Sequence, residues 1–203
     1  MAGHTMKNKG KDTELTFGVS GRLYESNVLL YDHQTESLWS QLKEEAVTGP
    51  MTGTRLVAVP SSLTTWKQWQ TQHPETFVLS TQTGYDRNYD YSPYEAYARY
   101  PSPLFPIANQ DDRLAPKERI IGVSLNGKHK AYSLTALEKR GTPLDDHIGE
   151  RAVRVSYDAE AKSARIVDGK SGEILPSVIA YWFAWASFHP DASVYGSESQ
   201  TSQ

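Results

Sequence analysis

The sequence contains no cysteine. This absence excludes disulfide bonds, thiolate zinc sites, iron–sulfur clusters and a cysteine nucleophile, so stability must come from side-chain packing. No apolar run approaches the roughly 20 residues that a helix needs to cross a bilayer core. The first residues, MAGHTMKNKGKDTE, also lack the apolar stretch of a secretory signal. As it stands, the sequence predicts a soluble cytoplasmic protein, and an exported one if it is a fragment of a longer chain.

Neither sign of charge dominates. The sequence has 21 Lys and Arg against 24 Asp and Glu, a net charge of −3. Such a balance gives no field strong enough to indicate nucleic acid or an anionic membrane as a partner. A chain of 203 residues is near the upper end of a single domain and can bury a sizeable core. We expect one domain, with no nucleic-acid partner and no membrane insertion.

Motifs for catalysis and cofactors are missing as well. Neither Ser20 nor Ser124 lies in the Gly-x-Ser-x-Gly pattern of a nucleophile elbow, and no phosphate loop or dinucleotide fingerprint occurs. The segment 86–90 resembles the opening of a calcium loop, but Tyr91 and Tyr97 stand where Gly and Glu are required. We therefore predict no metal and no cofactor, and nothing indicates a particular enzyme activity.

Alternation of apolar and polar residues predicts short strands in the N-terminal half, at 15–19, 27–31, 37–40, 55–59 and 77–79. Between the last two strands, Ser61 or Ser62 can begin a short helix that carries Trp66 and Trp69 on one face and stops at Pro74.

In the C-terminal half, Asn126-Gly127 predicts a tight hairpin between strands at 119–125 and 128–132, because both turn residues accept a positive φ. Ser133 can cap a helix that ends near Gly141. A second hairpin is predicted from 152–157 and 164–167, followed by a buried apolar helix at 178–188. The fold class is therefore α+β and β-rich, with mostly antiparallel sheet and a few short helices.

The pattern Trp-x-x-Trp-x-x-x-His-Pro occurs at 66–74 and again at 182–190, a shift of 116 positions (182 − 66). Further identities at the same shift include Gly53 with Gly169 and Pro60 with Pro176. We interpret this as an internal duplication of a strand–helix–strand unit with its tryptophans packed on the sheet. His73 and His189 are then interpreted as matched helix stops, which the helix dipole favours.

This reading divides the chain into a disordered segment 1–13, a single domain 14–196 and a disordered tail 197–203. Within the domain, repeat units at about 14–80 and 119–195 flank an insert, 81–118, rich in Tyr and Pro and predicted to be a loop. So long a loop in a compact domain usually has a function or hidden structure.

The insert holds six of the twelve tyrosines between Tyr85 and Tyr100. Tyrosine presents a large, rigid and amphipathic surface at low entropic cost, which suits binding of a protein or a glycan. The alternative is a loop that merely pins itself onto the sheet. Two acidic pairs, Asp111-Asp112 and Asp145-Asp146, could supply a general acid and base, but adjacent Asp residues more often bond their own backbone in turns.

Several motifs together resemble a microbial family known as domain of unknown function 3179. They are 16–21 (TFGVSG), 31–32 (YD), 37–41 (SLWSQ), 111–114 (DDRL), 116–118 (PKE), 182–185 (WFAW) and 188–190 (FHP). The resemblance runs from about Leu15 to Tyr195 and implies no established activity. Family members typically carry a Cys-Pro-x-Cys segment before this region, and often an export signal, which this sequence lacks. The resemblance therefore corresponds to the C-terminal part of the family pattern.

Our leading hypothesis is a non-catalytic or accessory binding domain with an unknown protein or glycan as its partner. One alternative is a carboxylate-dependent hydrolase that uses Asp32, Asp111 or Asp112 with Arg113 or Lys117. Another is a structural or assembly subunit. The predicted binding residues are Asp32, Trp39, Gln41, Tyr85, Asp86, Arg87, Tyr89, Asp111, Asp112, Arg113, Lys117 and Glu118.

Overall fold

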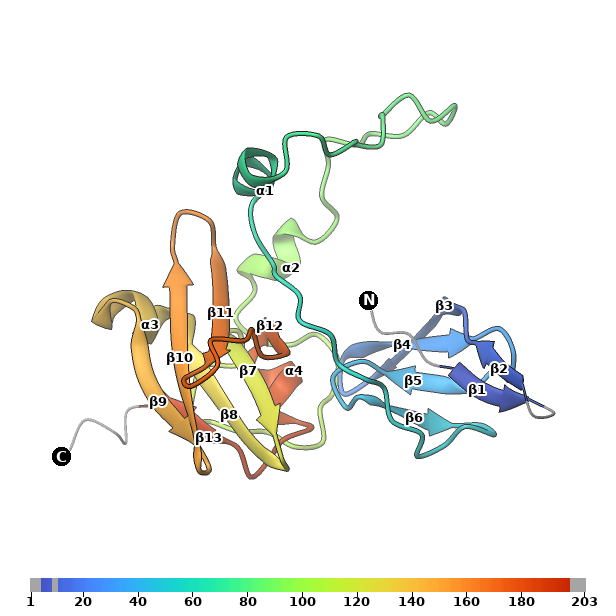
Figure 1. Cartoon of the computed structure of the whole chain (residues 1–203). Helices are drawn as coiled ribbons and strands as arrows, with labels where there is room; N and C mark the ends of the chain where they lie inside the picture. The colour runs from blue at the N-terminus through green and yellow to red at the C-terminus, as the bar shows by residue number, and fades with distance from the viewer. Residues whose placement is uncertain (1–4, 9–10, 198–203) are drawn as a thin grey trace.

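The structure is a computed structural model that describes residues 5–8 and 11–197, with side chains from residue 14 onward. Two groups of strands lie at opposite sides of the molecule in Figure 1, and the green segment between them projects away from both. The β-rich α+β class predicted from the sequence is confirmed, with mostly antiparallel sheets and, in the described residues, four short helices. None of these helices is long and apolar enough to cross a membrane.

The N-terminal group is a four-stranded antiparallel meander in the order β3-β4-β5-β6. Its strands are β3 (Phe17–Tyr24), β4 (Asn27–Asp32), β5 (Leu38–Ser40) and β6 (Glu45–Thr48). The predicted strands at 15–19, 27–31 and 37–40 thus fall within or close to observed ones. A separate hairpin pairs β1 (Thr5–Asn8) with β2 (Lys11–Glu14), in a segment that we had predicted to be disordered. The remaining predicted disorder, at 1–4, 9–10 and 198–203, lies outside the described residues.

The C-terminal group contains a four-stranded sheet in the order β12-β7-β8-β13 and a three-stranded antiparallel sheet in the order β11-β10-β9. The strands are β7 (Arg119–Leu125), β8 (Lys128–Ser133), β9 (Leu144–Ile148), β10 (Arg151–Asp158), β11 (Ser163–Asp168), β12 (Ser177–Tyr181) and β13 (Ser193–Tyr195). Both predicted hairpins are confirmed, and Asn126 and Gly127 have the positive φ values, 49° and 74°, that their turn requires.

Helix α3 (Leu134–Arg140) begins and ends as the sequence indicates. The hydroxyl of Ser133 accepts a hydrogen bond from the Ala136 amide at 3.0 Å, and Gly141 follows the helix with a φ of 82°. Leu134 and Leu137 on this helix are buried in a core cluster with Ile121, Val155 and other apolar residues of β7 to β11. Burial of each such side chain is worth about 1.5–3 kcal/mol, so this cluster holds the C-terminal group together.

The segment 178–188, predicted to be one buried helix, is a strand followed by a short helix. Residues Ser177–Tyr181 form β12, which pairs with β7, and only Trp182–Ala186 form α4. Val178 and Ile179 are β-branched and lie beside an open edge of β7, so pairing with that edge outweighs the apolar helix pattern. The tryptophans of α4 are buried as predicted, Trp182 fully and Trp185 at 2% exposure.

The first copy of the tryptophan motif does not form the predicted unit. Helix α1 (Trp66–Gln72) is capped by Thr65 rather than Ser61 or Ser62, and no residue of it is buried. The predicted strands at 55–59 and 77–79 are absent, apart from an isolated bridge between Glu45 and Arg55. Trp66 and Trp69 are 48% and 38% exposed, so the prediction that they pack on a sheet is wrong. The internal duplication itself stays a prediction.

Residues 57–105 form the projecting segment in Figure 1, which we call the arm. It holds α1 and a second short helix, α2 (Glu95–Arg99), inside the insert that we had predicted to be a loop. Neither helix buries a residue. The arm therefore gains little from the core of either strand group.

Candidate functional site

Asp32 and Trp39, two of the predicted binding residues, lie inside the N-terminal sheet. Both are fully buried, and the indole N–H of Trp39 donates to the Asp32 carboxylate at 2.8 Å. Thr35 donates to the same carboxylate from its amide and its hydroxyl, at 2.5 and 2.8 Å. Burial acts to raise the pKa of Asp32, but these hydrogen bonds lower it below its usual value. These contacts hold the turn between β4 and β5, and Gln41 beyond β5 is exposed.

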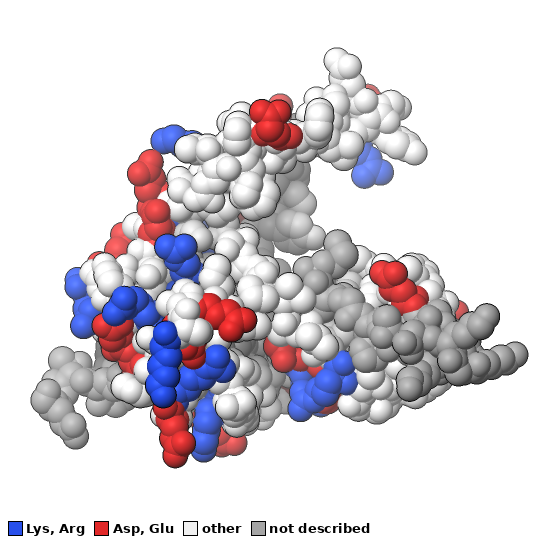
Figure 2. Space-filling view, in the orientation of Figure 1, with Lys and Arg blue, Asp and Glu red and all other residues white. Residues whose placement is uncertain are grey.

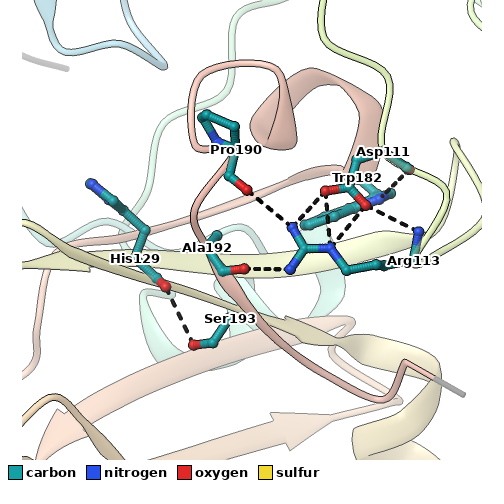
Figure 3. Close-up of polar contacts among 7 residues, drawn as sticks. All are labelled: Asp111, Arg113, His129, Trp182, Pro190, Ala192 and Ser193. Atoms are coloured by element: carbon teal, nitrogen blue, oxygen red, sulfur yellow. Dashed lines mark hydrogen bonds and ion pairs between the residues drawn. The ribbon is translucent and has the colours of Figure 1, made fainter. Parts of the chain in front are cut away.

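Asp111 and Arg113 form a clamp on the C-terminal group (Figure 3). The guanidinium of Arg113 donates to both carboxylate oxygens of Asp111, at 2.5 to 3.0 Å. It also donates to the carbonyl of Ala192 at 2.6 Å and lies over the Trp182 ring, 5.5 Å from its centroid. Hydrogen bonds from Arg113 hold the pKa of Asp111 below its usual value.

The clamp is closed by Trp182, whose indole N–H donates to the Asp111 carbonyl at 2.8 Å. The segment after the arm is thereby fixed to α4 and to the chain that leads into β13. Asp112, between the two clamp residues, is exposed. The two adjacent carboxylates therefore have different environments, because that of Asp111 is bound to Arg113 and that of Asp112 is exposed. Such a difference is typical of a turn rather than of a catalytic pair.

Glu118 and Lys117 lie at the start of β7. The Glu118 carboxylate accepts from the Ser133 hydroxyl at 2.5 Å and from the Thr135 amide at 3.3 Å, so it reinforces the cap of α3. Lys117 donates to the backbone carbonyl of Tyr97, and its ammonium lies 3.3 Å from the centroid of the Tyr97 ring. Burial lowers the pKa of Lys117. This cation–π contact joins the base of the arm to the C-terminal group.

The remaining predicted residues lie on the outer part of the arm. Tyr85 is 72% exposed and Tyr89 is 47% exposed, while Asp86 and Arg87 are exposed beside them. The Arg87 guanidinium lies 5.8 Å from the centroid of the Tyr85 ring, and the Tyr89 hydroxyl is within 2.5 Å of the Thr83 hydroxyl. These side chains contact neighbours in their own loop, not a sheet.

The twelve predicted residues therefore fall into three places: the interior of the N-terminal sheet, the clamp at the start of the C-terminal group, and the arm. None of them lines either of two cavities described below. The Lys117–Tyr97 contact brings the second and third places together. Of the predicted set, the residues with exposed side chains that a ligand could reach are the arm residues, Gln41, Asp112 and Arg113.

A histidine pair that the sequence did not reveal lies where the two groups of strands meet. The rings of His129 on β8 and His189 after α4 are 4.3 Å apart between centroids, and the Trp185 ring lies 4.4 Å from His189. Ser124 on β7 shares a hydrogen bond of 2.8 Å with His129 Nδ1.

Burial, together with the nearby His129, lowers the pKa of His189 to about 4. Burial also lowers the pKa of His129, against the attraction of Asp191. Both rings are therefore neutral at pH 7. His189 follows the end of α4, and its backbone amide donates to the Ala186 carbonyl at 3.0 Å. Its interpretation as a helix stop stays a prediction, and in the neutral form its ring gains little from the helix dipole.

A cavity of about 550 Å³ opens beside the β7–β8 turn and the end of β11, lined by Lys128, Arg151, Asp168 and Lys170 among others. The Asp168 carboxylate accepts from the Lys170 and Ser171 amides and from Arg151 at 2.6 to 2.9 Å. Donation from the Ser171 amide, followed by Arg151, lowers the pKa of Asp168. The Asp168 carboxylate therefore stabilises the turn after β11. No group of three or more acidic, His or Cys side chains among the described residues could hold a metal ion.

Comparison with known proteins gives one match. The model of a family described as "Protein of unknown function (DUF3179)" matches residues 3–192. No curated protein and no solved structure matches the chain.

Proposed function

The chain belongs to the DUF3179 family of proteins of unknown function, and we propose that it is an accessory binding domain that contacts its partner through the arm. The observation that carries this proposal is the exposure of large apolar and aromatic side chains along residues 57–105. Phe77 is 100% exposed and Leu79 is 89% exposed. Further such side chains are Val57, Val59, Leu63, Trp66, Val78, Tyr91, Tyr94, Tyr100, Leu104 and Phe105.

Such exposure is costly in an isolated domain. Apolar surface loses roughly 25 cal/mol for each Å² that stays in water, and contiguous exposed patches on soluble proteins commonly mark interaction sites. Figure 2 shows the projecting arm with few charged side chains, whereas Lys, Arg, Asp and Glu are interspersed over the visible face of the C-terminal group. A surface of this composition suits contact with a protein or a glycan. It carries too few charges of either sign to attract a strongly charged partner.

The tyrosines give the arm a polar component as well. Tyr85, Tyr89 and Tyr91 each combine an apolar ring with a hydroxyl, and Arg87 and Asp86 lie among them. Aromatic and Arg side chains are enriched where binding energy concentrates in interfaces. The base of the arm is anchored by Lys117, so binding at its outer part would be transmitted to a fixed point on the C-terminal group.

The test is replacement of Tyr85, Tyr89 and Tyr91 together by alanine, followed by screening on arrays of glycans and of purified proteins. We expect the triple variant to lose a ligand that the original chain binds, with unchanged thermal unfolding. The matched control replaces Val19 and Leu23, exposed apolar residues of β3 outside the arm, by alanine. Retention of every ligand by the triple variant would contradict the proposal.

A second candidate, an assembly subunit, is supported by the run Phe77-Val78-Leu79, in which all three side chains are more than half exposed. This function predicts self-association that Leu79→Asp abolishes, measured by light scattering coupled to size-exclusion chromatography. If the chain is a monomer at all concentrations, the assembly function is excluded. The hydrolase alternative gains no support from Asp32 or Asp111, since their carboxylates are committed to neighbouring residues.

We also propose that the two tryptophan motifs descend from one ancestral unit. In support, α1 and α4 begin at the matching tryptophans, Trp66 and Trp182. His73 and His189 both pack against the tryptophan four residues earlier in a tilted arrangement, with ring centroids 4.1 and 4.4 Å apart. The surroundings of the two copies differ, because residues 177–181 pair with β7 whereas the matching residues 61–65 form no strand.

A further inference from the structure

Helix α1 lies over the β10–β11 hairpin and leaves a cavity of about 380 Å³ beneath it. Figure 1 shows the helix on the projecting arm, near the tip of that hairpin. The volume falls in the range of about 300–1,000 Å³ that is usual for small-molecule sites. The residues on its two walls come from segments more than 80 positions apart, so only the fold brings them together.

The helix is held in place by contacts with the hairpin turn. The Thr65 amide donates to the Ala161 carbonyl at 3.0 Å, and the Thr64 hydroxyl donates to the same carbonyl at 3.3 Å. Lys67 adds an exposed ion pair with Glu160 at 3.3 Å. The cavity is therefore bounded by two elements with a defined relative position.

The floor of the cavity is polar. Ser156 pairs with Arg165 across β10 and β11, and Asp158 pairs with Ser163 two residues further. Because side chains alternate along a strand, all four lie on the same face of the hairpin, opposite the buried Val155 and Ile166. Asp158 uses one carboxylate oxygen to accept from the Ala161 amide at 2.9 Å and has a second oxygen for a ligand.

The opposite wall carries an aromatic ring with amides beside it. Trp69 lines the cavity with 38% of its surface exposed, and Gln68 and Gln72 lie on either side along α1. The Trp69 indole N–H donates to the Thr76 hydroxyl at 3.0 Å, and the His73 ring packs against the indole at a tilt of 35°, with centroids 4.1 Å apart. These two contacts fix the orientation of the ring before any ligand arrives.

We propose that this cavity binds a neutral saccharide. The inference rests on the proposed binding function and names the ligand class for one site on the arm. The apolar face of a pyranose ring packs on an indole, while its hydroxyl groups need both donors and acceptors. Gln68, Gln72, Ser156 and Ser163 supply both kinds, Arg165 supplies donors and Asp158 supplies an acceptor.

The charges on the cavity wall favour a neutral ligand. Arg165 and Asp158 carry opposite charges and lie on neighbouring cross-strand pairs, so neither an anion nor a cation is strongly preferred. A purely apolar ligand would leave the serines and amides without partners, which is unfavourable. An uncharged polyol with one apolar face satisfies both walls.

The test is titration of the full chain with three neutral trisaccharides, maltotriose, cellotriose and triacetylchitotriose, followed by calorimetry and tryptophan fluorescence. We expect at least one trisaccharide to bind, and Trp69→Ala to weaken its binding by tenfold or more. The matched control is Trp66→Ala, which removes a tryptophan from the same helix that is 48% exposed, against 38% for Trp69, and that does not line the cavity. It should leave the affinity within twofold.

Arg165→Gln gives a second measurement that does not depend on the stability of α1, because Arg165 is exposed on a sheet strand. It should weaken binding at least threefold. Binding of no trisaccharide at millimolar concentration, or equal losses in Trp66→Ala and Trp69→Ala, would overturn the saccharide site. The proposed function fails separately, if alanine at Tyr85, Tyr89 and Tyr91 leaves array binding unchanged.

Discussion

Acidification from pH 7.5 to 5.0 should weaken the fold through His189. The pKa of this ring is about 4 in the folded protein, against an ordinary value of 6.5. A depressed folded value means that the stabilisation is complete above pH 6.5 and is lost as the pH falls toward 4. A difference of this size corresponds to about 3 kcal/mol in full, of which about 2 kcal/mol is already lost at pH 5.

The window between pH 7.5 and 5.0 lies above the ordinary pKa values of the carboxylates, which are near 4. Burial raises the pKa of Glu44 toward this window, and the comparison with a histidine variant removes that contribution because it is common to both proteins. Among the groups close to His189, His129 has a lowered pKa as well and adds to the loss, while Asp191 and Arg55 act on His129 with opposite signs. The measurement is urea unfolding at the two pH values, extrapolated to water.

The variant His189→Phe keeps a ring between Trp185 and His129 but cannot be protonated. We expect the loss of stability on acidification to shrink by about 2 kcal/mol in this variant. The control is His147→Phe, which removes an exposed histidine from β9 and should leave the loss unchanged. An equal pH dependence in His189→Phe and the original chain would refute the burial argument.

Three further outcomes are expected. Gly122→Ala should lower the free energy of unfolding in urea by about 2–3 kcal/mol, because the new methyl group would overlap the Trp185 indole. The control is Gly172→Ala, whose methyl group would meet no atom within 4 Å and which should cost only backbone strain, about 1 kcal/mol. Asp32→Asn should cost about 1–3 kcal/mol in thermal unfolding, since one oxygen of Asp32 accepts from the Thr35 amide and the other from the Trp39 indole, and an amide side chain has only one acceptor atom; a variant as stable as the original would show that these bonds contribute little. Phe77→Ser should leave the melting temperature unchanged within the error of a scan, because the side chain is 100% exposed; a marked decrease would mean that the arm packs against the body in solution.

Local chemistry let the sequence predict much of the C-terminal group. Asn126-Gly127 can adopt the two positive φ values of its turn, and Ser133 can satisfy the first amides of α3, whatever the rest of the chain does. The same holds for the β10–β11 hairpin, where alternation of Val153, Val155 and their neighbours marks the buried face. These features depend on residues within a few positions of one another.

The candidate site was predicted less well, because the type of a residue does not reveal whether other residues of the chain already bind its side chain. Asp32, Trp39, Asp111 and Arg113 are chemically suited to a binding site, yet the side chain of each is already bound by another residue of the chain. For Trp39 and Asp32 the partner is seven positions away, but for Arg113 it is a carbonyl 79 positions away. The cavity under α1 and the His129–His189 pair escaped prediction for the same reason.

The sequence alone determined the turns, the cap of α3, the β-rich class and the two matching tryptophan motifs, since these follow from local backbone preference and side-chain pattern. Only the tertiary structure decided what each tryptophan motif became. Residues 177–181 found an open edge on β7 and formed a strand that buries Trp182 and Trp185 beside it. The matching residues before Trp66 formed no strand, and the same motif remained an exposed helix on the arm.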